Sequence, residues 1–279
     1  MTINRTKLGY VISRTGLYLV LVASSIVMLV PFYWMLSTSL KLEANVFTAE
    51  PQWIPNPATL DNFVQVWTRL PFARFIFNSV FVASMVTLSN VFFDTLAGYV
   101  FAKLKFPGRD KIFFALLLTL MVPFQVNLIP LFRLMQMLKW IDTYLGLIVP
   151  GATSIFGIYL MRQYISSIPD ELLDAARVDG ASEFRIFWRI VAPLSLPGIA
   201  TLAIFTFMSS WTDFLWPLIV TSSMEMRTLP VGIALLQDYH TVHWAQTMAG
   251  STIAALPMIV VFLIMQRHFI AGLTAGALK

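Results

Sequence analysis

Six segments of about 20 mostly apolar residues divide this chain of 279 residues, and about 20 such residues are needed for a helix to cross a bilayer. Hydrophobic residues make up 58% of the sequence and charged residues 12%, about half the usual charged share of soluble domains. The alternation of barrel strands is absent, so we expect an all-α integral membrane protein with one transmembrane domain over residues 1–279. The predicted helices cover about residues 15–36, 75–100, 112–132, 143–161, 194–220 and 247–266.

Positive charge is distributed unevenly among the segments that join these helices. Cytoplasmic segments of membrane proteins carry an excess of Lys and Arg. With the N-terminus in the cytoplasm, 13 of the 19 Lys and Arg residues fall on the cytoplasmic side. We therefore expect both termini to be cytoplasmic. The 13 residues are Arg5, Lys7, Arg14, Lys103, Lys105, Arg109, Lys111, Arg162, Arg177, Arg185, Arg189, Arg267 and Lys279.

The net charge of +5 does not indicate nucleic-acid binding, because the basic residues stand at the ends of apolar segments, where membrane topology places them. The apolar run after Arg14 is longer than the hydrophobic region of a signal peptide, so we expect a retained helix. The chain contains no cysteine, which excludes disulfide and thiol chemistry.

One expected cytoplasmic loop, over residues 164–193, carries the signals of two short helices. Pro169 and the two acidic residues after it suit the first turn of a helix, and Gly180 suits its end. Ser182 can cap a second helix. Two adjacent alanines in the first helix would let another surface approach the backbone closely. From the residues alone, this loop is either an interfacial anchor or a contact for a partner in the aqueous phase.

Residues 174–182 read Asp-Ala-Ala-Arg-Val-Asp-Gly-Ala-Ser, and Pro193 follows. This pattern resembles the EAA loop of ABC importer permeases, in which Glu-Ala-Ala is followed by Asp-Gly-Ala and then by a proline. Asp174 stands where glutamate is usual, so the carboxylate is kept but is one methylene shorter. The resemblance implies that the loop is a coupling helix seated in a groove of a cytoplasmic ATPase. The residues implied in this contact are Asp174, Ala175, Ala176, Asp179, Gly180, Ala181 and Ser182.

Three further stretches resemble carbohydrate-type permeases, so the resemblance covers nearly the whole chain. They are residues 211–218, 227–232 and 271–276, and the last is similar to the C-terminus of MalG-type permeases. Thr212 stands where asparagine is commoner in that family. The resemblance implies the six-helix type I ABC importer permease fold. It also implies import of sugars or related polyols and sugar phosphates across a prokaryotic plasma membrane.

The resemblance implies partners as well. This chain would form a heterodimer with a second permease subunit, and an ATP-binding cassette ATPase dimer would hold the ATP and Mg²⁺. This chain itself would then bind no cofactor. An extracytoplasmic solute-binding protein would deliver the sugar substrate. Closure of the ATPase dimer would move the coupling helices and switch the permeases between inward-facing and outward-facing states.

Ionisable residues inside membrane spans are costly and are candidates for function. Asp94, late in the second predicted helix, is expected to pair with Lys103 or Lys105, or with a partner subunit. Asp213 is followed by Pro217, which frees a backbone carbonyl, so local polar bonding is expected there. Asp213 is therefore either a structural or gating residue, or it lines the transport pathway.

Five polar side chains within the predicted helices have two possible roles. Asn78, Ser79, Asn90, Gln125 and Asn127 either hydrogen-bond between helices or contact a sugar in the pathway. Pro123 and Pro130 flank the last two, which predicts a kinked third helix that faces a cavity.

The chain contains no Gly-x-x-x-x-Gly-Lys-Ser/Thr phosphate loop, no nucleophile–base motif and no metal-ligand spacing among its three histidines. We therefore expect no catalytic residues, no metal site and no enzyme activity, with energy from a partner or an ion gradient. An ion-coupled secondary transporter is one alternative, although such proteins need coupling carboxylates and often show repeats. A membrane scaffold that only holds other subunits is the second alternative.

Overall fold

The computed structural model describes residues 3–237 and 242–275, and every regular element within these ranges is helical. Three helices are long and apolar enough to cross a membrane on their own. Three further pairs of helices pass the same test together but are bent at a short break, which gives up to six spans. The all-α architecture predicted from the apolar segments is confirmed.

The helices fall into two compact units. Two helices, α13 (Leu229–Ala234) and α14 (Trp244–Ala275), contribute residues to both. The first unit is Met1–Arg69 with Ile233–Ile253, and the second is Leu70–Gly232 with Ala254–Lys279.

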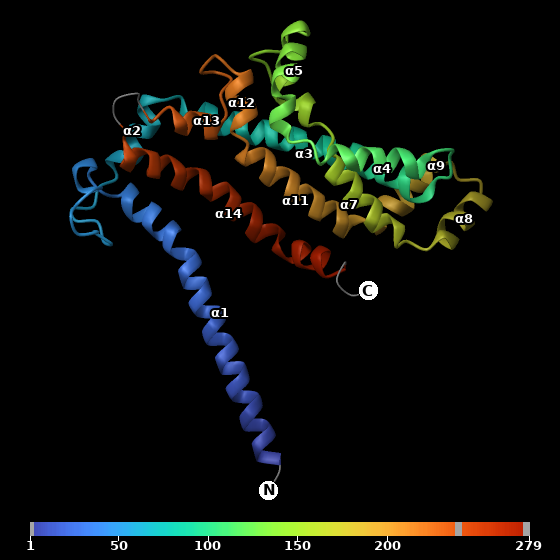
Figure 1. Ribbon diagram of the computed structural model, residues 1–279, viewed down its shortest axis with the longest axis horizontal. Coiled ribbons are helices and arrows are strands. Elements are labelled where there is room, and N and C mark those ends of the chain that lie inside the picture. The colour runs from blue at the N-terminus through green and yellow to red at the C-terminus, as the bar shows by residue number, and fades with distance from the viewer. Residues whose placement is uncertain (1–2, 238–241, 276–279) are drawn as a thin grey trace. The chain divides into compact units, whose positions relative to one another are not determined.

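The first unit contains α1 (Ile3–Ser39), which Figure 1 shows as one long blue rod. Its segment Arg14–Ser39 has the length and hydropathy of a membrane span, and its apolar window is fully exposed in the single chain. An apolar surface of this extent requires lipid or another subunit around it. The unit also contains the short helices η1 (Glu43–Asn45) and α2 (Asp61–Arg69).

Side-chain hydrogen bonds fix the segment between α1 and α2. Asn62 donates from Nδ2 to the carbonyl oxygens of Ser39 (2.8 Å) and Lys41 (2.7 Å), which ties the end of α1 to the start of α2. The Glu43 carboxylate accepts a hydrogen bond from the backbone N–H of Trp244 (2.7 Å). A carboxylate at the start of α14 satisfies a donor that has no helical partner.

Lys41 is buried without a counter-ion in the same segment. Its Nζ atom has no hydrogen-bond partner and lies 4.1 Å from the centroid of the Trp34 ring. Burial lowers the pKa of this ammonium group. The attraction between a cation and an aromatic face therefore holds Lys41 against the last turns of α1.

The second unit contains most of the helices. Its longest member, α3 (Phe72–Lys103), packs along α7 (Ile155–Ser166) and α11 (Leu196–Thr212), as Figure 1 shows. The other elements are α4 (Arg109–Thr119), α5 (Phe124–Met137), α6 (Tyr144–Ile148), η2 (Val149–Gly151), α8 (Asp170–Val178), α9 (Glu183–Ile186), the π-helical turn η3 (Phe187–Val191), α10 (Ala192–Leu194) and α12 (Leu215–Val220).

The third predicted helix, over residues 112–132, is broken. It consists of α4 and α5, which meet at an angle of 97°. The bend is much sharper than the expected kink, because the chain leaves the helix before Pro123. Proline has no N–H group to donate to the preceding turn, and here it stands immediately before the first residue of α5.

Two more predicted helices are interrupted. The segment Tyr144–Gly151 bends by 42° relative to α7, and Glu183–Leu194 bends by 80° relative to α11. The helix predicted over residues 194–220 also stops at Thr212, and α12 continues the chain after Asp213. The breaks therefore gather in the second unit, around α3.

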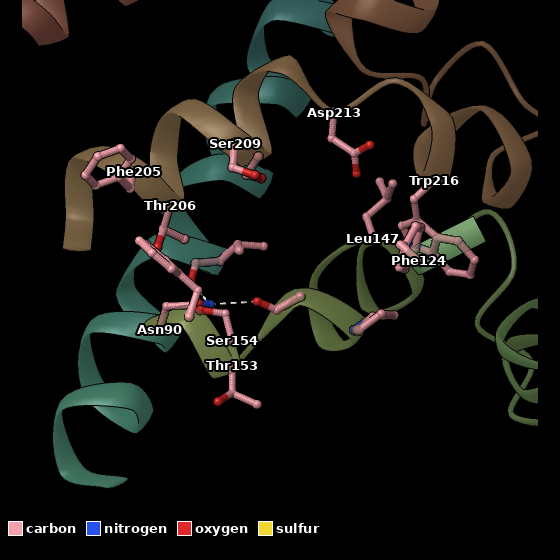
Figure 2. Close-up of a pocket in the computed structure, with 15 residues that line it drawn as sticks. Asn90, Phe124, Leu147, Thr153, Ser154, Phe205, Thr206, Ser209, Asp213 and Trp216 are labelled. Atoms are coloured by element: carbon pink, nitrogen blue, oxygen red, sulfur yellow. Dashed lines mark hydrogen bonds between the residues drawn. The ribbon is translucent and has the colours of Figure 1, made fainter. Parts of the chain in front are cut away.

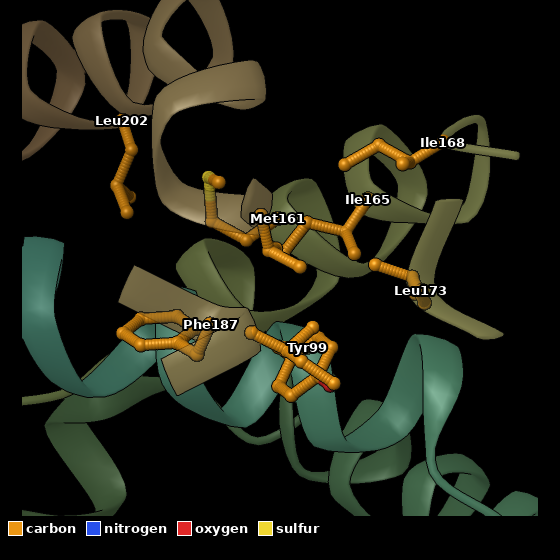
Figure 3. Close-up of a cluster of buried hydrophobic side chains, with 9 residues drawn as sticks. Tyr99, Met161, Ile165, Ile168, Leu173, Phe187 and Leu202 are labelled. Atoms are coloured by element: carbon orange, nitrogen blue, oxygen red, sulfur yellow. The ribbon is translucent and has the colours of Figure 1, made fainter. Parts of the chain in front are cut away.

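A cluster of buried side chains joins the C-terminal part of α3 to three other helices (Figure 3). Tyr99 of α3, Met161 and Ile165 of α7, Leu173 of α8 and Leu202 of α11 are each at most 2% exposed. Leu173 comes from outside the predicted spans, so its insertion fixes the position of α8 against them.

Gly98 sets the distance between α3 and α7. A Cβ atom at this position would lie 2.7 Å from the Met161 Cβ and 2.9 Å from the Arg162 backbone nitrogen. Both distances are too short for ordinary contacts, so glycine permits this close approach of two spans.

We expect Gly98→Ala to push α3 and α7 apart and to destabilise the protein by about 1–3 kcal/mol, the usual cost of overpacking. Gly16→Ala is the matched control, because nothing lies within 4 Å of the new methyl group. The measurement is the thermal unfolding midpoint in detergent. Equal midpoints for the two variants would contradict the close packing of α3 on α7.

Candidate functional site

Three helix breaks of the second unit border a cavity of about 570 Å³: the break before α5, the break before α7 and the break between α11 and α12. Its walls come from α3, the segment before α7, the C-terminal half of α11 and the starts of α5 and α12 (Figure 2). Irregular backbone within a span is tolerated where it is buried in protein or lines a cavity, so the breaks and the cavity belong together. The polar lining residues are Asn90, Thr153, Ser154, Thr206, Ser209, Ser210 and Asp213.

Asp213 is the ionisable residue among those that line the cavity. It stands in the break between α11 and α12, and Figure 2 shows its carboxylate directed into the cavity. The carboxylate lies close to the backbone N–H groups of Leu215 and Trp216 in the first turn of α12. Acceptors at a helix start satisfy donors that have no helical partner. Asp213 thus has a local structural role and also faces the cavity, so its role in transport stays a prediction.

The prediction that Asp94 pairs with Lys103 or Lys105 is wrong. The buried Asp94 carboxylate accepts hydrogen bonds from the Thr153 hydroxyl (2.6 Å) and from the Ser154 backbone N–H (3.1 and 3.2 Å to its two oxygens). Lys103 stands nine residues further along α3. That separation is about 13.5 Å along a helix and half a turn around it, so the two side chains cannot meet.

Two more side chains of α3, near Asp94, pair backbone carbonyl groups at the same break before α7. Asn90 donates from Nδ2 to the Gly151 carbonyl (2.6 Å), and Ser89 donates from Oγ to the Ala152 carbonyl (2.7 Å). Together with Asp94, they pair the backbone groups that are released between η2 and α7.

Asn90 lines this cavity, but Asn78, Gln125 and Asn127 do not. Asn78 is buried in α3, where Nδ2 donates to two backbone carbonyls of the segment before α13 (2.8 Å each). Its Oδ1 atom accepts a hydrogen bond from the Tyr144 hydroxyl (2.7 Å). Gln125 and Asn127 are exposed on α5. The structure therefore places Asn78 in helix packing and does not bring Asn78, Gln125 or Asn127 together with Asp213.

The predicted coupling loop forms the helices α8 and α9, which lie near one end of α3 and α7 (Figure 1). Gly180 has a φ of +79°, a left-handed conformation that favours glycine and ends α8. Ser182 Oγ accepts a hydrogen bond from the Arg185 N–H at the start of α9 (3.4 Å). The helix end and the cap are those that the sequence indicates.

The apolar residues of α8 divide between two faces. Leu173 is buried in the cluster of Figure 3, and Ala176 packs partly against that cluster. Leu172 and Val178 are 47% and 88% exposed. The apolar residues of α8 thus form an inner half against the cluster and an outer, exposed half. Of the predicted coupling residues, Asp174, Ala175, Asp179, Gly180 and Ser182 are exposed, and Ala176 and Ala181 are half-buried.

Arg177 is engaged within the loop. Its Nε atom lies 2.8 Å from Oε1 of Glu183, and its Nη1 atom lies 2.7 Å from Oδ1 of Asp174. The guanidinium therefore joins the end of α8 to the start of α9.

Sequence reasoning missed a row of hydroxyl groups on α11. Thr206, Ser209 and Ser210 line the cavity and are three and four residues apart, the spacing of one helix face. Polar residues at this spacing in an otherwise apolar span were a usable signal. Thr153 and Ser154 gave no comparable signal, because their part in the site depends on Asp94 of another helix.

Comparison with known proteins identifies the family. A family model described as "binding-protein-dependent transport system inner membrane component" matches residues 94–274. The arabinooligosaccharides transport system permease protein AraQ of Bacillus subtilis (strain 168) is 37% identical over 95% of this chain and 96% of its own length. The trehalose/maltose transport system permease protein MalG of Thermococcus litoralis is 34% identical over 96% and 98%. The sn-glycerol-3-phosphate transport system permease protein UgpE of Yersinia pestis is 33% identical over 94% and 97%.

A solved structure shows the same fold. The crystal structure of a bacterial ABC transporter that imports the acidic polysaccharide alginate matches with a TM-score of 0.77 over 96% of this chain and 99% of the matched chain. The sequence identity is 22%.

This chain belongs to the family of inner-membrane components of binding-protein-dependent transport systems. Its fold is that of ABC importer permeases, and it is a multi-pass protein of a prokaryotic plasma membrane. The resemblance to carbohydrate-type, MalG-like permeases is confirmed.

We expect Asp94→Leu to destabilise the protein strongly, because the Ser154 N–H and the Thr153 hydroxyl would lose their acceptor away from water. Each such loss costs about 1–3 kcal/mol. Asp94→Asn, which keeps one acceptor oxygen, is the matched control and should lose less. Thermal midpoints and the monodisperse fraction in detergent measure the effect. A leucine variant as stable as the asparagine variant would show that Asp94 does not hold this break.

Proposed function

We propose that this chain is a permease subunit of an ATP-driven, binding-protein-dependent importer of sugars or related polyols and sugar phosphates. The loop over residues 164–193 lies on the cytoplasmic side, as do both termini, and couples a partner ATPase to alternating access. The observation that carries the proposal is the form of α8, a short helix outside the spans that is fastened on one face and open on the other.

The open face of α8 is suited to a groove on an ATPase. Leu172, Ala175 and Val178 stand three residues apart and are all exposed, so they form an apolar strip along one side of the helix. Ala175 lets the groove wall approach the backbone. ATP and Mg²⁺ are held by that partner, and this chain contributes neither a cofactor site nor a catalytic group.

The volume and the polar lining of the cavity are suited to a polyhydroxylated substrate. Its volume of about 570 Å³ lies within the roughly 300–1,000 Å³ range of ligand pockets. Thr206, Ser209 and Ser210 offer hydroxyl groups along one wall, and the Asp213 carboxylate and the Asn90 side-chain oxygen offer acceptors on others. Sugar hydroxyls pair with groups of this kind. The relatives named above, for arabinooligosaccharides, trehalose/maltose and glycerol 3-phosphate, agree with this class.

The complete importer contains a second, different permease, an ATPase dimer and an extracytoplasmic solute-binding protein. The exposed apolar surface of α1 is one surface on which lipid or the second permease can pack. The binding protein docks on the outer loops and releases its sugar when the permeases face outward.

Affinity purification of this chain from native membranes should recover a second permease with an EAA-type loop and an ATPase with a phosphate-loop motif, identified by mass spectrometry. Uptake by intact cells should also stop when ATP is depleted. Recovery of this chain alone, or uptake that survives ATP depletion but collapses with the ion gradient, would instead support an ion-coupled secondary transporter.

We expect the double substitution Asp179→Lys with Gly180→Pro to abolish sugar uptake. Proline holds φ near −65°, so it cannot adopt the φ of +79° that ends α8. Gly180→Asn is the matched control, because asparagine tolerates the left-handed conformation, and it should keep most of the uptake. Normal uptake by the double variant at equal membrane levels would refute the coupling role of this loop.

A further inference from the structure

We propose that Tyr99 and Lys103 of α3 are positioning residues that clamp the two ends of α8, so that a displacement of α8 moves α3 with it. This inference rests on the proposed function, because it concerns how the coupling helix acts on the spans. Neither residue belongs to the loop whose sequence resembles the EAA pattern.

Lys103 holds the N-terminal end of α8. Its Nζ atom lies 2.7 Å from Oδ1 of Asp170, the first residue of α8, and 2.5 Å from the carbonyl oxygen of Ile168. The Lys103 side chain is only 6% exposed, although that of Asp170 is 73% exposed. The ammonium group is therefore fixed between α7 and α8 and is not a mobile surface charge. Its hydrogen bond lowers the pKa of the Asp170 carboxyl, so that carboxylate stays ionised at neutral pH.

Tyr99 holds the C-terminal end of α8 through one intermediate residue. Its hydroxyl is hydrogen-bonded to the Glu183 carboxylate at the start of α9. The same carboxylate binds the guanidinium of Arg177 in the last turn of α8. Tyr99 is 2% exposed, so packing of its ring within the core holds the hydroxyl group in place.

The two contacts share one face of α3. Tyr99 and Lys103 are four residues apart, which places them one turn from each other on the same side of the helix. Between the two ends of α8, Leu173 is buried in the cluster of Figure 3. Apolar packing alone lets a helix slide or rotate, whereas hydrogen bonds are directional. Polar contacts at both ends therefore restrict α8 to moving together with α3.

A clamp of this kind matters for coupling and not only for stability. If one end is released, α8 can follow the ATPase by pivoting while α3 stays in place. Closure of the ATPase would then continue, but the cavity wall that α3 contributes would not respond. We therefore expect variants in which the ATPase still closes but the cavity no longer opens.

The experiment uses the complete importer with its binding protein in proteoliposomes, oriented with the cavity's outer side facing the bath. The chain has no cysteine, so Ser209→Cys supplies a single thiol in the cavity wall. Vanadate with radiolabelled ATP traps the closed ATPase, and the trapped nucleotide measures closure. The reaction rate of the thiol with a membrane-impermeant maleimide measures outward opening. The partner subunits are used in cysteine-free form.

In the parent complex, vanadate trapping should raise the labelling rate of the thiol. In Tyr99→Phe and in Lys103→Met, trapping should persist while the rise in labelling falls about tenfold, the factor that one charge-assisted hydrogen bond contributes. Lys103→Arg keeps the charge and the donors and should restore the response. Tyr159→Phe and Lys105→Met remove the same groups from exposed positions and should behave as the parent.

The outcomes test the clamp and the proposed importer function separately. A merely structural role would lower trapping and labelling in the same proportion, because less complex would assemble. Full labelling at full trapping in both Tyr99→Phe and Lys103→Met would overturn the clamp and leave the importer function intact. A parent complex that traps nucleotide without any change in labelling, or that traps none, would overturn the proposed function itself.

Discussion

Backbone groups that are released where a helix breaks must find hydrogen-bond partners, because no water is available to them in the interior of a membrane protein. In this protein the partners come largely from α3. Asn90 and Asp94 pair the groups between η2 and α7. Ser79 Oγ accepts a hydrogen bond from the Leu229 N–H at the start of α13 (2.8 Å). Asn78 holds the segment before that helix. The break before α7 and the segment at the start of α13 thus depend on one unbroken helix.

The polar residues of α3 are placed within its packing face and not opposite to it. The buried positions recur every three or four residues along the helix, the usual period of a helix face against a core. Ser79, Asn90 and Asp94 occupy this face between apolar neighbours. At Gly98, where α7 is intact and close, the face carries no side chain at all. Polar side chains on α3 therefore lie where the neighbouring segment is irregular, and a glycine lies where the neighbouring helix is intact.

This dependence explains what could be predicted from the sequence. The apolar segments, the Gly180 helix end and the Ser182 cap are local patterns, and each was correctly inferred from residues close together in the chain. The partner of Asp94 could not be inferred in this way, because Thr153 and Ser154 belong to a neighbouring helix. A cation on the same helix was the nearest candidate in sequence, but helix geometry excludes it. The sharp bend before Pro123 was underestimated, since proline indicates where a helix is interrupted and not by what angle.

The site residues also fall into two groups: those that belong to one local sequence pattern and those that only the fold brings together. The loop of residues 164–193 has a long sequence pattern, so its coupling residues could be predicted together. The cavity has no such pattern, since it is assembled from α3, α5, α11, α12 and the segment before α7. Asp213 and Asn90 line it, but Asn78, Gln125 and Asn127 do not. Asn78 has its polar atoms occupied by packing, and this outcome depends on a loop about 150 residues later in the chain.

The position of α3 between the loop and the cavity gives the arrangement a mechanical consequence. Tyr99 contacts the loop, and Asn90 lines the cavity. These residues are about 13.5 Å apart along one helix. No proline interrupts α3 between Phe72 and Lys103, and the helix is unbroken along this length, so it is suited to pass a displacement from one end to the other. The segment before α7 has no ladder of its own and is held by Asn90 and Asp94. A shift of α3 must therefore carry that segment with it, which changes the cavity wall without requiring any bending inside the helix that transmits the motion.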